Sequence, residues 1–155
     1  MQLPSLILLY SCIDALGWLA TEQTNHKTQL TFTEWVDRYL LPQRPLPCTA
    51  LELYAARCGV LHTLTPDSDL AKEGKVRRVA YAWGKASVHE LQQSLDGSTA
   101  AQFVAVHIDD LWDGLRLGTA QLFEDATKDA SLAQRMRERG LRYFSYVRPA
   151  SSTTQ

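Results

Sequence analysis

The stretch TALELYAARCGVLH, residues 49–62, begins with the apolar spacing that a buried helix requires. Thr49 and Glu52 form a capping-box pattern at its start, in which each side chain bonds the backbone N–H of the other residue. The pattern predicts a helix that begins at Thr49 and ends near Thr65 and Pro66. A helix with such a cap and such an apolar face favours a mainly helical fold for the chain.

Two earlier segments have the same helical period. The first runs from Leu6 to about Ala20, and the polar loop TEQTNHKTQ follows it. In TFTEWVDRYLLP, Thr31 and Glu34 repeat the capping-box pattern, and Pro42 marks the expected stop. The proline-rich QRPLPC is then a non-helical connection.

The pattern changes to that of strands in the second half of the chain. KVRRVAYAW is rich in β-branched and aromatic residues and predicts a strand at about 76–83, and FVAVHI predicts a second strand at 103–108. A helix is expected between them, from Ala86 to Leu95, followed by the loop DGST.

The last third of the chain returns to helix. Asp109 or Asp110 is expected to cap a long helix that ends at about Lys128. A shorter helix follows over 131–139, and Gly140 is expected to close it. LRYFSYV then fits a short strand or an extended segment.

The composition is that of one folded domain. The 155 residues are 45% apolar and 21% charged, which excludes general disorder. The net charge of −1 excludes a globally basic nucleic-acid binder, so any RNA contact has to rest on a local patch. We predict a single domain over residues 1–148, mainly α with a small two-stranded β insertion, and a disordered tail at 149–155.

The N-terminus does not fit a signal peptide, because no Lys or Arg precedes Lys27 and Asp14 interrupts the apolar segment. The cysteines at 12, 48 and 58 have no metal-ligand spacing, which predicts reduced and mostly buried thiols. We therefore expect a cytoplasmic protein that does not bind a membrane.

Arg57 and His62 interrupt the apolar helix, and an arginine is rarely buried without a partner. In a uniform α-helix the two residues point about 140° apart and lie about 7.5 Å apart along the axis, with Tyr54 and Cys58 between them. One such helix cannot clasp a metal ion, but the pair can flank a groove. Two copies related by a two-fold axis would bring two arginines and two histidines into one cleft.

The segment RCGVLH resembles the R-x(4–6)-H signature of the HEPN superfamily. WVDRYLLP, YAARCGVLH and YAWG resemble segments of a plasmid-borne branch of short HEPN-like proteins. The resemblance spans about Leu6 to Asp125 and implies a HEPN-like helical bundle that forms a homodimer.

The resemblance implies a metal-independent endoribonuclease of toxin or defence type, with no cofactor, an active site shared by two protomers, and a possible antitoxin partner. His62 would move the proton of the RNA 2′-hydroxyl or of the leaving 5′-oxygen, and Arg57 would stabilise charge on the phosphate. Tyr54 and Cys58 would line the substrate site. Nucleolytic members commonly have a polar residue where this chain has Cys58, so a non-catalytic HEPN-like module for nucleotide or RNA binding, or for dimerisation, is the alternative.

Other interpretations of these residues remain open. Arg57 can instead pair with a buried acid, Asp14 or Glu52, while His62 bonds near the helix C-terminus. The apolar faces of the first and third helices could continue into a partner protomer. The residues of those faces are Leu9, Ile13, Leu16, Leu53, Val60 and Leu61.

Two further clusters are candidates for binding. Arg77 and Arg78, in a basic cluster with Lys72, Lys75 and Lys85, could bind the RNA backbone, or could form a charged, solvated strand edge. The group His107, Asp109, Asp110 and Asp113 could in principle hold a metal, but acids at a helix start favour a cap, and we predict no metal site.

Overall fold

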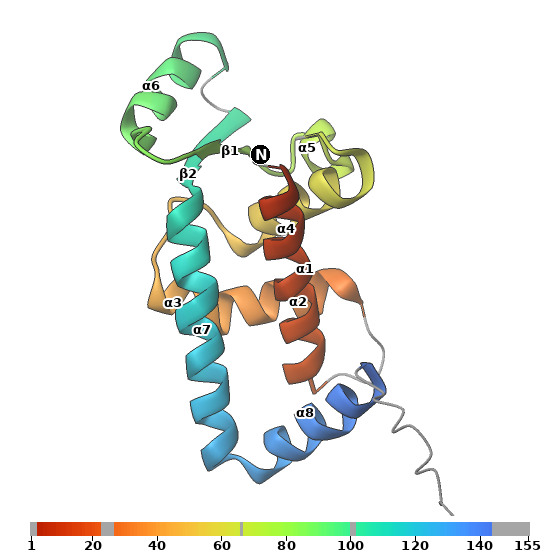
Figure 1. Ribbon diagram of the computed structural model, residues 1–155. Coiled ribbons are helices and arrows are strands. Elements are labelled where there is room, and N and C mark those ends of the chain that lie inside the picture. Colours follow the sequence, from red (N-terminus) through yellow and green to blue (C-terminus); the bar gives the residue numbers. More distant parts are fainter. Residues whose placement is uncertain (1–2, 23–26, 66, 100–101, 144–155) are drawn as a thin grey trace, which may run out of the picture.

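The computed structural model describes residues 3–22, 27–65, 67–99 and 102–143. The fold is mainly α with a small two-stranded β insertion, as the sequence predicts (Figure 1). In chain order the elements are α1 (Leu3–Ala20), α2 (Thr28–Trp35), the π-helix η1 (Val36–Leu40), α3 (Leu41–Gln43), α4 (Ala50–Cys58), the π-helix η2 (Gly59–Thr63), α5 (Asp69–Lys72), β1 (Arg78–Ala82), α6 (Val88–Thr99), β2 (Phe103–His107), α7 (Ile108–Lys128) and α8 (Ala130–Tyr143).

The core lies where α1, α2, α4 and α7 meet. In Figure 1, α1 and α7 run in a similar direction, and the α2–η1–α3 segment crosses both of them. The largest fully buried side chains come from all four helices and from the strands, and include Leu9, Tyr10, Ile13, Phe32, Leu53, Val106, Leu111 and Leu122. Apolar residues at three- and four-residue spacing thus supply the buried faces, as the sequence predicts.

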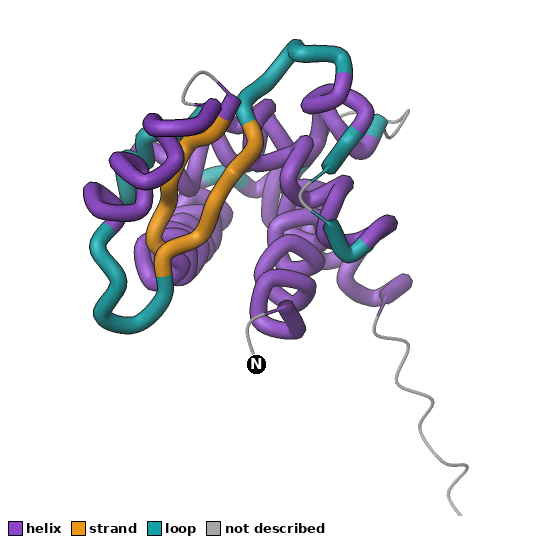
Figure 2. Tube along the Cα trace, turned by 90° about the horizontal axis from the view of Figure 1, so that it is seen from above, coloured by secondary structure: helices purple, strands orange, loops and turns teal. Residues whose placement is uncertain are grey.

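The β insertion is a parallel pair with a helical crossover. β1 and β2 pair in register from Arg78 opposite Phe103 to Ala82 opposite His107, and α6 covers one face (Figure 2). Parallel strands need a crossover of about a dozen residues or more, which α6 provides. The predicted loop DGST is wrong, because α6 continues through it to Thr99.

The predicted cap and stop of the second helix are both wrong. α2 begins at Thr28, and the Thr31 hydroxyl donates to the Thr28 carbonyl at 3.1 Å instead of capping a helix start. Helical backbone also continues past Pro42 to Gln43, after the π-helical turn η1. A proline has no N–H and its ring crowds the carbonyl four residues earlier, and the wider turn of η1 accommodates both.

Two predicted boundaries in the last third are also corrected. His107, rather than Asp109 or Asp110, is the N-cap of α7, because its Nδ1 accepts the Asp109 N–H at 3.2 Å. Gly140 lies inside α8, which continues to Tyr143, so the start of LRYFSYV is helical. The rest of that segment and the predicted tail at 149–155 lie outside the described residues.

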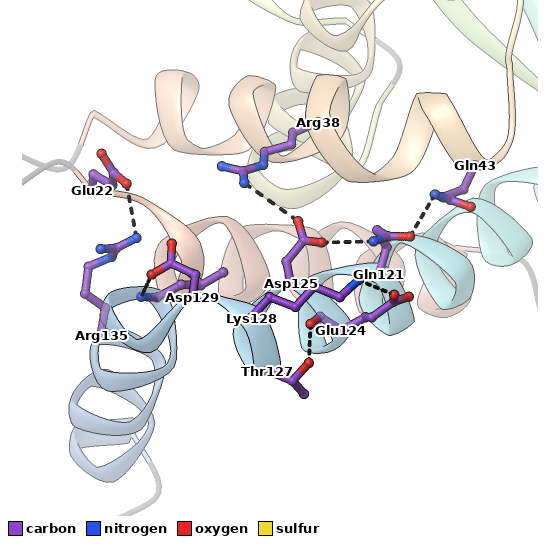
Figure 3. Close-up of polar contacts among 11 residues, drawn as sticks. Glu22, Arg38, Gln43, Gln121, Glu124, Asp125, Thr127, Lys128, Asp129 and Arg135 are labelled. Atoms are coloured by element: carbon purple, nitrogen blue, oxygen red, sulfur yellow. Dashed lines mark hydrogen bonds and ion pairs between the residues drawn. The ribbon is translucent and has the colours of Figure 1, made fainter.

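Charged side chains hold α8 and η1 to their neighbours (Figure 3). Arg135 of α8 pairs with Glu22 beyond α1 at 3.3 Å, and Arg38 of η1 lies 3.7 Å from Asp125 of α7. Arg139 donates to the carbonyls of Trp18 and Thr21 at 2.6 Å each. These two carbonyls belong to the C-terminal end of α1, where a cation is favourable.

The apolar helix α1 is long and apolar enough to cross a membrane by length and composition, with a mean hydropathy of 1.6 over 18 residues. A helix in the core of a folded domain meets the same criterion.

Leu9 and Ile13 of α1 and Leu53 of α4 are fully buried within this chain. These three residues therefore face the protein's own core and not a partner protomer, whereas Leu16 and Leu61 of the same predicted faces are only partly buried.

Gly118 marks the closest approach of α7 to η1. A Cβ at this position would lie 2.7 Å from the Tyr39 carbonyl oxygen and 2.9 Å from its carbon, and backbone cannot move aside cheaply. We expect Gly118→Ala to destabilise the fold by about 2 kcal/mol, because overpacking outweighs the gain in helix propensity. Urea denaturation measures the change.

Gly140→Ala is the matched control. Gly140 is also helical, but nothing lies within 4 Å of the position of its Cβ. The control is expected to stabilise the fold by up to about 1 kcal/mol. Equal effects of the two substitutions would contradict the close packing of α7 on η1.

Candidate functional site

A π-helical turn brings Arg57 and His62 together. α4 ends at Cys58, and the backbone continues as η2 over Gly59–Thr63. A π-helix has hydrogen bonds from residue i to i+5, so residues five apart approach each other. Arg57 Nη1 lies 3.2 Å from His62 Nε2. The predicted separation of about 140° is therefore wrong, because it assumes a uniform α-helix.

The local sequence explains the start of this helix. The capping box is present in full: the Thr49 hydroxyl accepts the Glu52 N–H at 3.2 Å, and the Glu52 carboxylate accepts the Thr49 N–H at 2.8 Å. The helix ends after η2 at Leu64, which adopts a left-handed backbone conformation. Both ends of the α4–η2 segment are thus fixed, and their positions determine where Arg57 and His62 lie.

The other edge of the Arg57 guanidinium binds Asp14 of α1. Arg57 Nε and Nη2 lie 2.8 and 2.7 Å from Asp14 Oδ2. The side chains are 13% and 20% exposed, so the pair is largely shielded from water. The interpretation that Arg57 pairs with Asp14 is confirmed, while Glu52 binds Arg77 instead.

Burial and the charges of neighbouring residues have opposite effects on the pKa values of Asp14 and Arg57. Burial raises the pKa of Asp14, and the adjacent Arg57 and His62 offset only part of that rise. Burial alone would lower the pKa of Arg57, but its hydrogen bond and charge interaction with Asp14 raise it. Asp14 Oδ1 is buried and has no hydrogen-bond partner among the residues that the structure describes. The carboxylate thus depends on Arg57 to remain charged.

The contact between Arg57 and His62 determines which imidazole nitrogen is the acceptor. A guanidinium can only donate hydrogen bonds, so a neutral His62 accepts through Nε2 and has its ring proton on Nδ1. His62 is exposed, whereas Arg57 is half-buried beneath it. The site therefore presents an imidazole and a fixed cation side by side at the surface, which suits proton transfer next to a phosphate.

Tyr54 and Cys58, the predicted substrate-site neighbours, both lie beside Arg57. The Arg57 guanidinium carbon is 5.9 Å from the centre of the Tyr54 ring, and its Nη1 is 4.0 Å from Cys58 Sγ. Burial, followed by interactions with Cys58, raises the pKa of Tyr54. The structure thus brings four of the six predicted site residues together.

Arg77 and Arg78, the other two, lie elsewhere. Arg77 Nε and Nη2 bind the Glu52 carboxylate at 2.6 and 3.0 Å, and Arg78 Nε binds Asp67 at 2.8 Å. Together they line a separate cavity beside β1 that does not include Arg57.

The thiols differ from one another in environment. Cys48 is buried, which raises its pKa to about 12, and Cys58 is half-buried. Cys12 of α1 is exposed, so the prediction of mostly buried thiols is wrong for this residue.

A cavity of about 350 Å³ adjoins Arg57 on the side of Asp14. Ser11, Thr28 and Thr31 supply further polar groups to its lining. These three residues were not predicted from the sequence to belong to a site. Ser11 and Asp14 lie one helical turn apart, and this i, i+3 spacing is the signal that could have placed them on one face.

The acidic group around His107 holds no metal site. His107 caps α7, and its Nε2 lies 3.2 Å from the Gly84 carbonyl. Within the described parts of the chain, no group of three or more His, Cys, Asp or Glu side chains is placed to hold a metal ion.

Comparison of the chain with protein-family models, with curated proteins and with solved structures finds no match in any of the three. Any statement about function therefore rests on the residues and on their geometry.

Proposed function

We propose that this chain is a HEPN-like, metal-independent endoribonuclease of toxin or defence type. The observation that supports it most is the contact of Arg57 Nη1 with the exposed His62, whose Nε2 lies 3.2 Å away. The pairing of a cation with a neutral imidazole is what RNA cleavage by the 2′-hydroxyl requires. Asp14 holds the guanidinium from behind and fixes its orientation.

In the proposed reaction the RNA phosphate takes the Arg57 Nη1 donor that His62 now accepts. His62 Nε2 is thereby free to remove the proton of the 2′-hydroxyl. The 2′-oxygen attacks phosphorus and the bond to the 5′-oxygen breaks, which leaves a 2′,3′-cyclic phosphate and a 5′-hydroxyl. The 5′-oxygen needs a proton of its own, and Arg57 neutralises the charge that gathers on the phosphate.

A homodimer would complete this chemistry. One imidazole cannot take a proton from the 2′-oxygen and give another to the 5′-oxygen at the same moment. A second copy across a two-fold axis would add a second Arg57 and a second His62 to the cleft, and this second His62, in its protonated form, would donate the proton that the 5′-oxygen needs. Light scattering is expected to give twice the 17.4 kDa chain mass at micromolar concentration. A stable monomer would contradict the shared site.

A non-catalytic HEPN-like module is the second candidate. It is favoured by the two contacts that commit one edge of Arg57 to Asp14, since an arginine with this partner also contributes to folding. In that case the pair would bind RNA or a nucleotide, or hold the dimer, without bond cleavage.

Cleavage of RNA in the presence of EDTA separates the two candidates. We expect single-stranded RNA to be cut at an unchanged rate when EDTA removes divalent metals, because Arg57 and His62 supply the charge and the proton transfer. Binding without cleavage would favour the non-catalytic module. Cleavage that requires added metal would contradict the proposed mechanism.

A further inference from the structure

A second cavity, of about 350 Å³, lies beside β1 and carries a concentration of positive charge. Its lining includes four cations, Lys72, Lys75, Arg77 and Arg78, against one carboxylate, Glu52. The ionised side chains of the lining carry a net charge of +3 at neutral pH, and three carboxylates outside the lining, Asp67, Asp69 and Glu73, pair with Arg78, Lys72 and Lys75. A concave, basic surface of this kind favours an oxyanion ligand.

The side chains of Arg77 and Arg78 are held in place by protein groups that bind only some of their N–H donors. Glu52 and the Pro47 carbonyl hold Arg77 through Nε and Nη2, and within the described part of the chain Nη1 keeps its two protons for a ligand. Asp67 and Gln102 hold Arg78 through Nε and Nη1. Such arginines are preorganised for a phosphate, because their side-chain entropy is already lost.

The two lysines are mobile point charges on the same cavity. The side chains of Lys72 and Lys75 are 58% and 63% exposed. Lys72 lies 3.9 Å from Asp69, which is a weak contact, and Lys75 lies 2.6 Å from Glu73. Exposed pairs of this kind contribute about 0–1 kcal/mol, so a phosphate can displace them. The carboxylates of Asp69 and Glu73 are not part of the lining.

A turn at Gly74 brings the two sets of cations together. Gly74 has a φ of +69°, a conformation that side chains disfavour, and it joins the end of α5 to the segment before β1. Lys72 and Lys75 are thereby placed on the cavity that Arg77 and Arg78 line from the strand side.

We propose that this cavity binds a backbone phosphate of the RNA strand, away from the phosphate that is cut. The inference rests on the proposed function for the identity of the strand. α4 connects the two sites: Glu52 lines the cavity, and Arg57, five residues later, lies about 7.5 Å further along the helix axis and about 140° around it. A strand of a few nucleotides that passes around α4 would contact both.

The salt dependence of RNA binding tests this proposal. The probe is a fluorescein-labelled RNA of about 12 nucleotides with 2′-O-methyl groups throughout, which cannot be cleaved. We expect the double variant Lys72→Ala, Lys75→Ala to reduce the slope of log affinity against log salt by about 0.7, the value for one phosphate contact of a single strand. Affinity at 0.1 M salt then falls by about 5-fold. Fluorescence anisotropy measures both quantities.

The matched control is Arg116→Ala with Lys128→Ala. It removes the same total charge from exposed positions of α7 that do not line the cavity. We expect its slope to equal that of the wild type, and equal slopes for the two double variants would overturn the inference. Because the probe is not cut, the outcome is separate from catalysis. A changed slope without cleavage of ordinary RNA would overturn the ribonuclease and leave the phosphate cavity in place.

Discussion

Replacing His62 by alanine is expected to lower the rate of RNA cleavage by about 10²–10⁴-fold, the usual effect of losing an acid–base group. The free energy of unfolding is expected to change by less than about 0.5 kcal/mol, because His62 is exposed and lies at the end of the helix. The loss of rate at unchanged stability identifies a group that acts on the substrate. Single-turnover cleavage and urea denaturation measure the two quantities.

His89→Ala is the matched control for His62. His89 is also exposed and helical, but it belongs to α6 of the β insertion. Its loss is expected to leave the cleavage rate unchanged. A His62→Ala variant that cleaves RNA as fast as this control would remove His62 from the proposed mechanism.

Replacing Arg57 by alanine is expected to affect both stability and cleavage. It leaves Asp14 as an unpaired, largely buried carboxylate, and breaking such a pair typically costs about 3–5 kcal/mol. We expect about 3 kcal/mol at neutral pH, because the two side chains retain some exposure to water. Cleavage is lost as well, since the phosphate then has no fixed cation.

The stability loss from Arg57→Ala should depend on pH in one direction. Burial already raises the pKa of Asp14, so its charged form is disfavoured in the fold, and removing Arg57 raises that pKa further. The folded state thus binds a proton more readily than the unfolded state. The penalty is full above the raised pKa of Asp14 in the folded variant and declines as the pH falls through that pKa. It is gone near the ordinary carboxylate value of about 3.9, below which Asp14 is protonated in the folded and the unfolded state alike.

Arg116→Ala provides the control for Arg57. Arg116 lies 3.4 Å from Asp113 on the surface of α7 and is 71% exposed, so its loss is expected to change stability by less than about 0.5 kcal/mol. If Arg57→Ala were as mild as this control, the buried pair with Asp14 would not be a significant part of the fold.

The sequence predicted those features that depend on neighbouring residues. The capping box of Thr49 and Glu52, the helical period of α1 and the strand composition around β1 and β2 are local, and each is confirmed. The helix through DGST was missed, since its turn-forming residues outweighed any local helical signal.

The geometry of the site could not be predicted, because it depends on the π-helical turn η2 and on contacts between distant residues. Nothing in RCGVLH signals the wider turn that brings Arg57 to His62. The choice of Asp14 over Glu52 as the partner of Arg57 was left open, since it depends on how α1 packs against η2. Arg77 takes Glu52 instead, across 25 residues of sequence.

The most direct test of the proposed activity compares an RNA with its fully 2′-O-methylated copy, both in EDTA. The mechanism requires a free 2′-hydroxyl as the nucleophile and no metal ion. We predict that the unmodified RNA is cut to products with 2′,3′-cyclic phosphate and 5′-hydroxyl ends, and that the methylated copy stays intact. Products with 3′-hydroxyl ends, or no products at all, would contradict the account.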